Sequence, residues 1–181
     1  MQMRSVAILT PEQLEALATK GESETQEFKC TAGTRKEAAE TMCAMLNQRG
    51  GHILFGVTSE GNVVGQQVAE RTIEEVSAEI QRIDPPAFPT VDRVRIAENR
   101  EVIAVHVGQG SSPPYRYRGT AFLRVGNTTR AMSADEYNRT LFERMHSEQR
   151  WENQPATAGP STTWTWRKSA IRWQRQCISA D

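Results

Sequence analysis

Three carboxylates and a lysine surround one aromatic residue within residues 22–29: Glu22, Glu24, Glu27 and Lys29 lie around Phe28. From residue 24 onward the side chains alternate as in a β-strand, which places Glu27 and Lys29 on one face. Clustered carboxylates can hold a divalent ion that hydrolyses phosphodiesters, and they can equally form a charged recognition surface. A third interpretation is that they are solvated charges at a strand edge.

In that third interpretation Glu27 pairs with Lys29 or with a distant arginine, Arg124. The glycine pair at 50–51 fits a tight turn into a buried strand at 52–57 better than it fits a phosphate cradle. Neither G-x-x-x-x-G-K-[S/T] nor a helix-opening G-x-G-x-x-G is present, so no motif supports an ATP site.

A second candidate is a basic and aromatic cluster in residues 115–130. Arg116 and Arg118 share a strand face opposite Tyr115 and Tyr117. This arrangement suits phosphate contacts on one side and core packing on the other, although ordinary surface charge explains it equally well. The candidate nucleic-acid contacts are Lys29, Arg116, Arg118, Arg124 and Arg130.

The elements that position these residues follow from capping, periodicity and turn signals. The order is helix, strand, helix, hairpin, helix, hairpin, hairpin, helix. We therefore expect an α+β fold with one mixed, mostly antiparallel sheet built from hairpins and with helices packed against it. The expected elements are a helix from Pro11 capped by Thr10, a strand at 24–29, a helix at 35–48, a hairpin of 52–57 with 63–64, a helix at 70–82, a hairpin of 91–96 with 102–107, strands at 115–117 and 121–125, and a helix capped by Ser133.

The net charge does not point to any class of binding partner, because 22 basic residues balance 22 acidic ones. Any contact with nucleic acid must come from a local basic patch. The three cysteines have neither metal-ligand spacing nor a disulfide framework. No run approaches the roughly 20 apolar residues of a membrane span. We expect a cytoplasmic protein without membrane contact.

The last 33 residues differ from the rest, and we divide the chain into a domain at 1–148 and a tail at 149–181. All four tryptophans lie in the tail, at Trp151, Trp164, Trp166 and Trp173. Read one base out of frame, residues 161–181 can encode a capped amphipathic helix. We expect a frameshift near Gly159. The alternative is a natural basic, aromatic tail that stacks on nucleic acid. In both cases we expect little order.

Several motifs in a fixed order resemble the AlbA-like domain of the Schlafen family over roughly residues 10–145, which is nearly the whole expected domain. In bacteria this domain often forms the N-terminal part of transcriptional regulators described as ATP-binding or divergent AAA proteins. The motifs are the acidic stretch at 22–29, Asn47-Gln48-Arg49-Gly50-Gly51, the strand at 53–57, Gly61, Gly65, Pro113, Tyr115 and the segment 124–130.

The resemblance implies nucleic-acid binding, and in animal Schlafens paired domains of this type cleave transfer and ribosomal RNA. Their active site pairs two glutamates, which Glu22 and Glu27 match, with an aspartate after the Gly-Val of the next strand. Thr58 and Ser59 stand there instead, and Glu60 is the nearest carboxylate. A residue displaced by one along a strand points to the opposite face.

We therefore expect a nucleic-acid-binding domain of a bacterial regulator or defence protein, which contacts the phosphate backbone of DNA or RNA without strong sequence readout. Binding would need no cofactor, and the chain would form a homodimer. One alternative is an endoribonuclease that uses Mg²⁺ or Mn²⁺ held by Glu22 and Glu27, with Glu60 as a substitute third carboxylate. Another is a truncated protein–protein interaction module.

Overall fold

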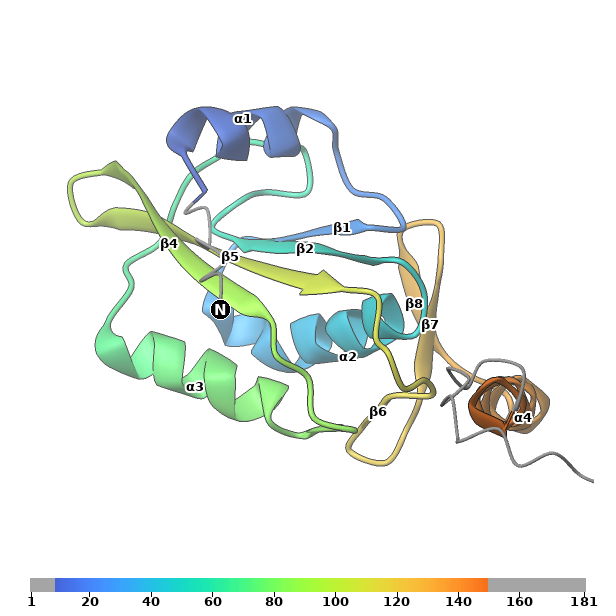
Figure 1. Ribbon diagram of the computed structural model, residues 1–181. Coiled ribbons are helices and arrows are strands. Elements are labelled where there is room, and N and C mark those ends of the chain that lie inside the picture. Colours follow the sequence, from blue (N-terminus) through green and yellow to red (C-terminus); the bar gives the residue numbers. More distant parts are fainter. Residues whose placement is uncertain (1–8, 150–181) are drawn as a thin grey trace, which may run out of the picture. The chain divides into compact units, whose positions relative to one another are not determined.

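The computed structural model describes residues 9–149 (Figure 1). The predicted disordered or frameshifted tail lies outside the described residues, apart from its first residue, so disorder and frameshift both stay predictions. The elements, in chain order, are α1 Pro11–Thr19, β1 Gln26–Lys29, the 3-10 turn η1 Ala32–Thr34, α2 Arg35–Leu46, β2 Gly50–Phe55, α3 Glu70–Ile80, β3 Ile83–Asp84, β4 Thr90–Ala97, β5 Arg100–Gly108, β6 Arg116–Tyr117, β7 Phe122–Val125, β8 Thr128–Ala131 and α4 Ala134–Gln149.

The central sheet has the strand order β1-β2-β5-β4. β1 runs parallel to β2, whereas the β2–β5 and β5–β4 pairings are antiparallel. Two short two-stranded sheets, β3–β6 and β7–β8, complete the described part of the chain. The α+β prediction with a mixed, mostly antiparallel sheet is therefore confirmed. Within residues 9–149, no helix is long and apolar enough to cross a membrane.

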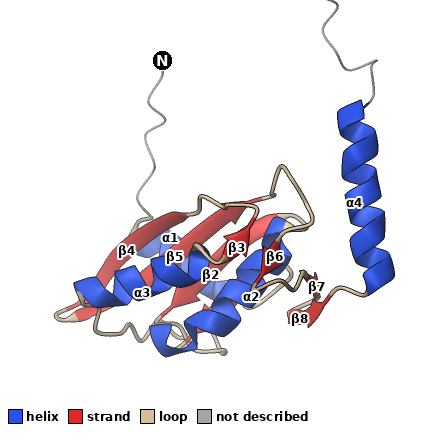
Figure 2. Cartoon of the chain, turned by 90° about the horizontal axis from the view of Figure 1, so that it is seen from below, coloured by secondary structure: helices blue, strands red, loops and turns tan. Residues whose placement is uncertain are grey.

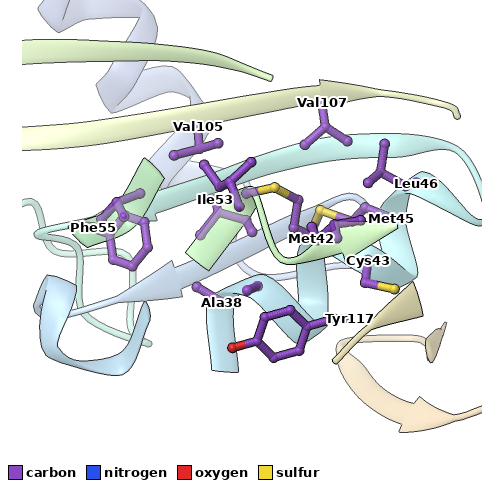
Figure 3. Close-up of a cluster of buried hydrophobic side chains, with 14 of the residues drawn as sticks. Ala38, Met42, Cys43, Met45, Leu46, Ile53, Phe55, Val105, Val107 and Tyr117 are labelled. Carbon is purple, nitrogen blue, oxygen red and sulfur yellow. The ribbon is translucent and has the colours of Figure 1, made fainter. Parts of the chain in front are cut away.

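Helices cover both faces of the central sheet (Figures 1 and 2). α1 packs Leu14 and Ala18 onto one face, in a cluster that includes Phe28 and Leu54. α2 and α3 cover the opposite face. There the larger core forms around α2, whose alanines let the helix approach the strands closely; Figure 3 shows Ala38, Met42, Cys43, Met45 and Leu46 in one cluster with Ile53, Phe55, Val105 and Val107.

Local signals place the helix ends where the sequence predicts them. The Thr10 hydroxyl accepts a hydrogen bond from the Gln13 amide, and the Gln13 side chain accepts one from the Thr10 amide. This reciprocal pair satisfies two amide donors that a helix start leaves without intrahelical partners. The Ser133 hydroxyl accepts from the Glu136 amide in the same way at the start of α4.

Two predicted hairpins differ from the structure. Residues 63–64 do not pair as a strand with β2, because β1 and β5 already occupy both edges of β2; a single bridge joins Val57 to Val63. The segments at 115–117 and 121–125 do not pair with each other either; one bridge joins Tyr117 to Thr120, within the turn between them. β6 pairs with β3, and β7 pairs with β8 across a tight turn that contains Gly126 at φ +62°. The sequence does not predict β8, because the residues of this strand are mostly polar.

Candidate nucleic-acid interface and carboxylate cluster

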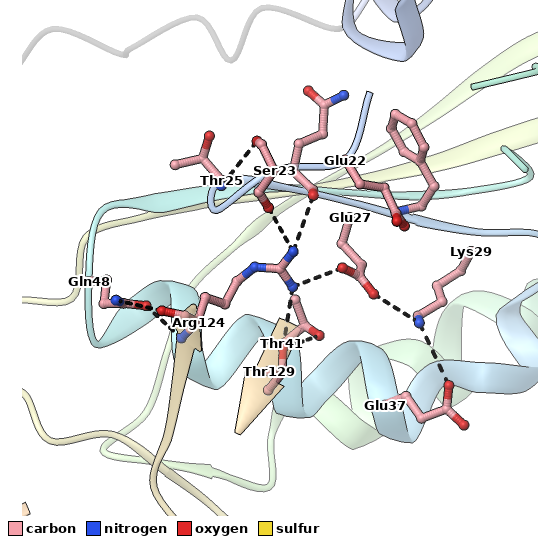
Figure 4. Close-up of polar contacts among 12 residues, drawn as sticks. Glu22, Ser23, Thr25, Glu27, Lys29, Glu37, Thr41, Gln48, Arg124 and Thr129 are labelled. Carbon is pink, nitrogen blue, oxygen red and sulfur yellow. Dashed lines mark hydrogen bonds and ion pairs between the residues drawn. The ribbon is translucent and has the colours of Figure 1, made fainter. Parts of the chain in front are cut away.

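The acidic stretch and the basic cluster meet inside the protein, at Glu27 and Arg124 (Figure 4). β1 directs Glu27 toward the α2 side of the sheet, and β7 directs Arg124 toward the same point. Nη1 of Arg124 donates to Oε2 of Glu27 at 2.8 Å. Nη2 donates to the Ser23 carbonyl at 2.7 Å, and the Arg124 side chain has no exposed surface.

The end of α2 holds β7 as a neighbouring strand would. The Gln48 side chain accepts from the Arg124 amide at 2.8 Å and donates to the Arg124 carbonyl at 3.1 Å. The Asn47 side chain binds neighbouring backbone in a similar way: it accepts from the Tyr115 amide and donates to the Tyr115 and Phe122 carbonyls. The side-chain amides of Asn47 and Gln48 thus hold the backbone in the position from which Arg124 reaches the interior.

Glu27 is buried and both of its carboxylate oxygens are occupied. Oε1 contacts Nζ of Lys29 at 2.9 Å, while Oε2 contacts Arg124. Burial alone would lower the pKa of Lys29, but the hydrogen bond to Glu27 and the charges of Glu27, Glu37 and Glu22 raise it above the ordinary value. Lys29 is thus a cation held between carboxylates, with 19% of its side chain exposed.

The other two candidate carboxylates do not converge on Glu27. Glu22 accepts a hydrogen bond from the Phe28 amide at 3.1 Å, so it fixes the backbone of β1. Glu60 is exposed in the turn after β2 and bonds to the Asn62 side chain. In residues 9–149, no three Asp, Glu, His or Cys side chains are grouped so that they could hold a metal ion. The residues present therefore do not fit a divalent-metal site.

The remaining arginines of the basic cluster lie at the surface, each beside an acidic residue. Arg116 pairs with Asp84, Arg118 with Glu79 and Arg130 with Glu136. Between 42 and 46% of each arginine side chain is exposed. We call Arg116, Arg118 and Arg130 the arginine face.

Two members of the arginine face lie beside the start of α4. Arg130 bonds to both oxygens of Glu136, and this hydrogen bond, with help from the Ser133 amide, lowers the pKa of the Glu136 carboxyl to about 2. Arg116 lies close enough to Tyr137 to interact with it electrostatically. Arg118, two residues after Arg116, donates a hydrogen bond to the Tyr117 hydroxyl. Residues from β6, β8 and α4 thus come together.

The family model described as Schlafen, AlbA_2 matches residues 22–133, a span that contains Glu27, Arg124 and the residues that join them. The chain belongs to the Schlafen AlbA_2 family. No curated protein matches it. Since the family match begins at Glu22 and ends at Ser133, it leaves out α1 and α4.

Two solved structures are similar to this AlbA_2 domain, both at 18% identity. One is the DIP2311 protein from Corynebacterium diphtheriae, with a TM-score of 0.51 over 74% of this chain, a likeness that shows the fold alone. The match spans only 32% of that protein's length. The other is the N-terminal domain of a protein from Nitrosomonas europaea described as related to the ATP-dependent DNA helicase RecG. Its TM-score is 0.47, and the match covers 66% of this chain and 93% of that domain.

The sequence indicated Asn47 and Gln48 only as part of the family motif and did not predict their role at the centre of this AlbA_2 domain. They are two polar amides that follow the apolar last turns of α2, and Arg49 separates them from the glycine pair. That position is the signal that could have found them, because helix ends face neighbouring backbone. Thr129, which accepts from Arg124 and contacts Thr41 at 3.0 Å, gives no comparable signal in the sequence.

Proposed function

We propose that this AlbA_2 domain binds nucleic acid through the arginine face and contacts the phosphate backbone without strong sequence readout. Guanidinium groups bind phosphate through two parallel hydrogen bonds. Exposed ion pairs contribute little to stability, so a phosphate can replace Asp84 beside Arg116 and Glu136 beside Arg130. Glu79, the partner of Arg118, is buried and bonded to Tyr117, so a phosphate would use the exposed part of the Arg118 guanidinium without displacing Glu79. The observation that carries the proposal is that Arg116 of β6 and Arg130 of β8 both lie half-exposed beside the start of α4, with the half-exposed Arg118 in the turn that follows β6.

Two residues of the expected contact set are left out of this proposal. Arg124 has no exposed side-chain surface, so it cannot reach a phosphate without unfolding of its surroundings. Lys29 is mostly covered and already lies between Glu27 and Glu37. Both act inside the carboxylate cluster, where they neutralise Glu27.

Binding is favoured over hydrolysis because the carboxylates are engaged in the fold. A divalent ion needs free carboxylate oxygens at its ligand positions. Here Arg124 and Lys29 occupy the oxygens of Glu27, and Glu22 holds the backbone of β1. The position of the expected third carboxylate contains Thr58, whose hydroxyl accepts from the Asn62 amide and closes the turn.

The test of binding compares two triple variants of equal charge. Arg116, Arg118 and Arg130 are replaced by Gln in one; Arg71, Arg93 and Arg95, on α3 and β4 at the other end of the sheet, are replaced in the other (Figure 1). Fluorescence anisotropy with a labelled RNA strand and with a DNA duplex should show weakened binding for the first variant alone. Equal affinities for both variants would contradict the proposal.

Hydrolysis is tested separately, by incubating transfer RNA with the protein and Mg²⁺ or Mn²⁺. We expect no metal-dependent cleavage. Cleavage that disappears in Glu22→Gln would favour the endoribonuclease. Glu22 is the better probe than Glu27, because replacing Glu27 would leave the buried Arg124 without its acidic partner.

We further propose that the domain acts as a cytoplasmic homodimer within a bacterial regulator or defence protein. A symmetric pair would present two arginine faces to one nucleic acid and so raise the overall affinity. Sedimentation equilibrium of the purified chain should give twice the monomer mass. A monomer at all concentrations would contradict the dimer but would leave single-domain binding intact.

A further inference from the structure

A cavity of about 470 Å³ lies between the loop that follows β1 and the segment before α3. It is lined by Cys30 and Thr31, by residues 64–67, which include Gln66 and Gln67, and by Arg100 at the start of β5. No Asp or Glu is among the residues that line it. The volume falls within the range of small-molecule sites, about 300–1,000 Å³.

Gln66 gives the cavity wall an unused hydrogen-bond donor. Its side-chain oxygen accepts from the Ala32 amide at 2.8 Å, and this bond fixes which way the amide group points. The amide nitrogen, Nε2, is buried and has no hydrogen-bond partner. Gln66 as a whole is only 8% exposed. Buried donors are almost always paired with protein or with water, so this one is open to an acceptor from outside the chain.

Arg100 supplies positive charge at the same place. Nη1 donates to the Gly65 carbonyl at 3.1 Å, which orients the guanidinium along the cavity wall. In the described part of the chain Arg100 has no carboxylate partner within ion-pair distance, unlike Arg93 on the neighbouring strand. The cavity therefore offers several hydrogen-bond donors, which are the other N–H groups of Arg100, the Thr31 hydroxyl and Nε2 of Gln66.

We propose that this cavity binds a small molecule through a phosphate or carboxylate group. The oxyanion would accept hydrogen bonds from Arg100, from Nε2 of Gln66 and from the Thr31 hydroxyl. Planar guanidinium groups suit both oxyanions, because each offers two oxygens to parallel N–H groups. The site shares no residue with the arginine face or with Glu22, Glu27 and Glu60, so it does not rest on nucleic-acid binding.

Cys30 provides a local readout, because its thiol is exposed and lines the cavity, whereas Cys43 is buried. The rate of Cys30 alkylation by iodoacetamide is measured by peptide mass spectrometry in inorganic phosphate, in acetate, and in chloride at the same ionic strength. Phosphate or acetate should slow alkylation of Cys30, and the more protective of the two identifies the oxyanion. Chloride should have no effect.

Arg100→Gln tests whether the protection comes from the proposed site. Removing one charge-assisted hydrogen bond should raise the anion concentration that gives half-maximal protection about tenfold or more. Arg95→Gln is the matched control, because Arg95 is an exposed arginine on the adjacent strand β4 and does not line the cavity. Circular dichroism checks that both variants are folded. Equal Cys30 rates in phosphate, acetate and chloride, or equal loss of protection in both variants, would overturn the proposal.

Discussion

At the scale of single residues, Arg124 joins parts of the chain that are far apart in the sequence. It links β7 to Glu27 on β1 and to the Ser23 carbonyl, while Gln48 holds its backbone. A buried guanidinium is tolerated only when its charge is paired and its donors are satisfied. Nε of Arg124 is the one donor of this guanidinium that lacks a partner. The ion pair with Glu27 therefore carries most of the compensation.

Replacing Arg124 by Met should destabilise the fold by about 3 kcal/mol or more, because it leaves Glu27 buried with only Lys29 as a partner. Arg71→Met is the matched control: it breaks an exposed pair with Glu75 on one helix, worth about 0.5 kcal/mol. Urea unfolding followed by circular dichroism measures both free energies. Equal losses would show that the buried pair is not a stabilising contact.

His52 should make stability depend on pH. Burial, with smaller effects from His106 and Lys20, lowers the pKa of His52 below the ordinary value of 6.5. The unfolded chain therefore takes up a proton before the folded chain does. The stabilisation is complete above about pH 6.5 and is lost as the pH falls through the folded-state pKa.

We expect the free energy of unfolding to fall with pH in that window, and to fall less steeply in His52→Gln. Denaturant titrations at a series of pH values check this, with the exposed His146→Gln as the control. Parallel pH profiles for wild type and His52→Gln would mean that the other titrating groups account for the whole dependence.

At the scale of elements, Gly50, the first residue of β2, lets the end of β5 approach closely. Gly50 has φ +77°, and a Cβ at this position would overlap the Val107 carbonyl oxygen and the Gly108 backbone. Gly119 has a similar φ of +85° but open space around it. The two positions therefore separate backbone strain from steric overlap.

Gly119→Ala should cost about 1 kcal/mol, the strain of a left-handed conformation. Gly50→Ala adds the overlap with β5 and should cost about 3 kcal/mol or more. Thermal and urea unfolding of the two variants give the comparison. If Gly50→Ala is no less stable than Gly119→Ala, the close approach of β5 does not require glycine.

The sequence predicts the helices and the β4–β5 hairpin well, because their signals are local. Thr10 and Gln13 cap α1 as expected, and the turn near Asn99 joins two apolar alternating strands. Strand partners are decided by contacts far apart in the chain. The pairing of β6 with β3, and the insertion of Arg124 beneath β1, depend on the amides of Asn47 and Gln48, which local patterns do not reveal.

The candidate site was predictable in composition but not in arrangement. The sequence offered a pairing of Glu27 with Lys29 or Arg124 as one interpretation, and the structure contains both contacts. It could not indicate that Arg124 is inside while Arg116, Arg118 and Arg130 are outside. That distinction follows from which face of β7 turns toward α2, and from the acidic partners that Asp84, Glu79 and Glu136 supply.

At the scale of the whole molecule, the charges of the interior are neutralised by buried pairs, whereas Arg116, Arg118 and Arg130 lie at the surface. The family's expected hydrolytic residues, Glu22 and Glu27, stabilise β1 and its junction with β7. The arginine face is the surface at which we propose that phosphates bind. With equal numbers of acidic and basic residues overall, the proposed binding would depend on this local surface and not on net charge.

The most direct test is the salt dependence of nucleic-acid binding, measured by anisotropy for wild type and for the variant with Arg116, Arg118 and Arg130 replaced by Gln. Each phosphate contact contributes a slope of about −0.7 to −0.9 in a plot of log K against log salt concentration. We predict a steep slope for wild type that becomes shallower by about two in the triple variant. A flat wild-type slope, or an unchanged slope in the variant, would contradict binding through the arginine face.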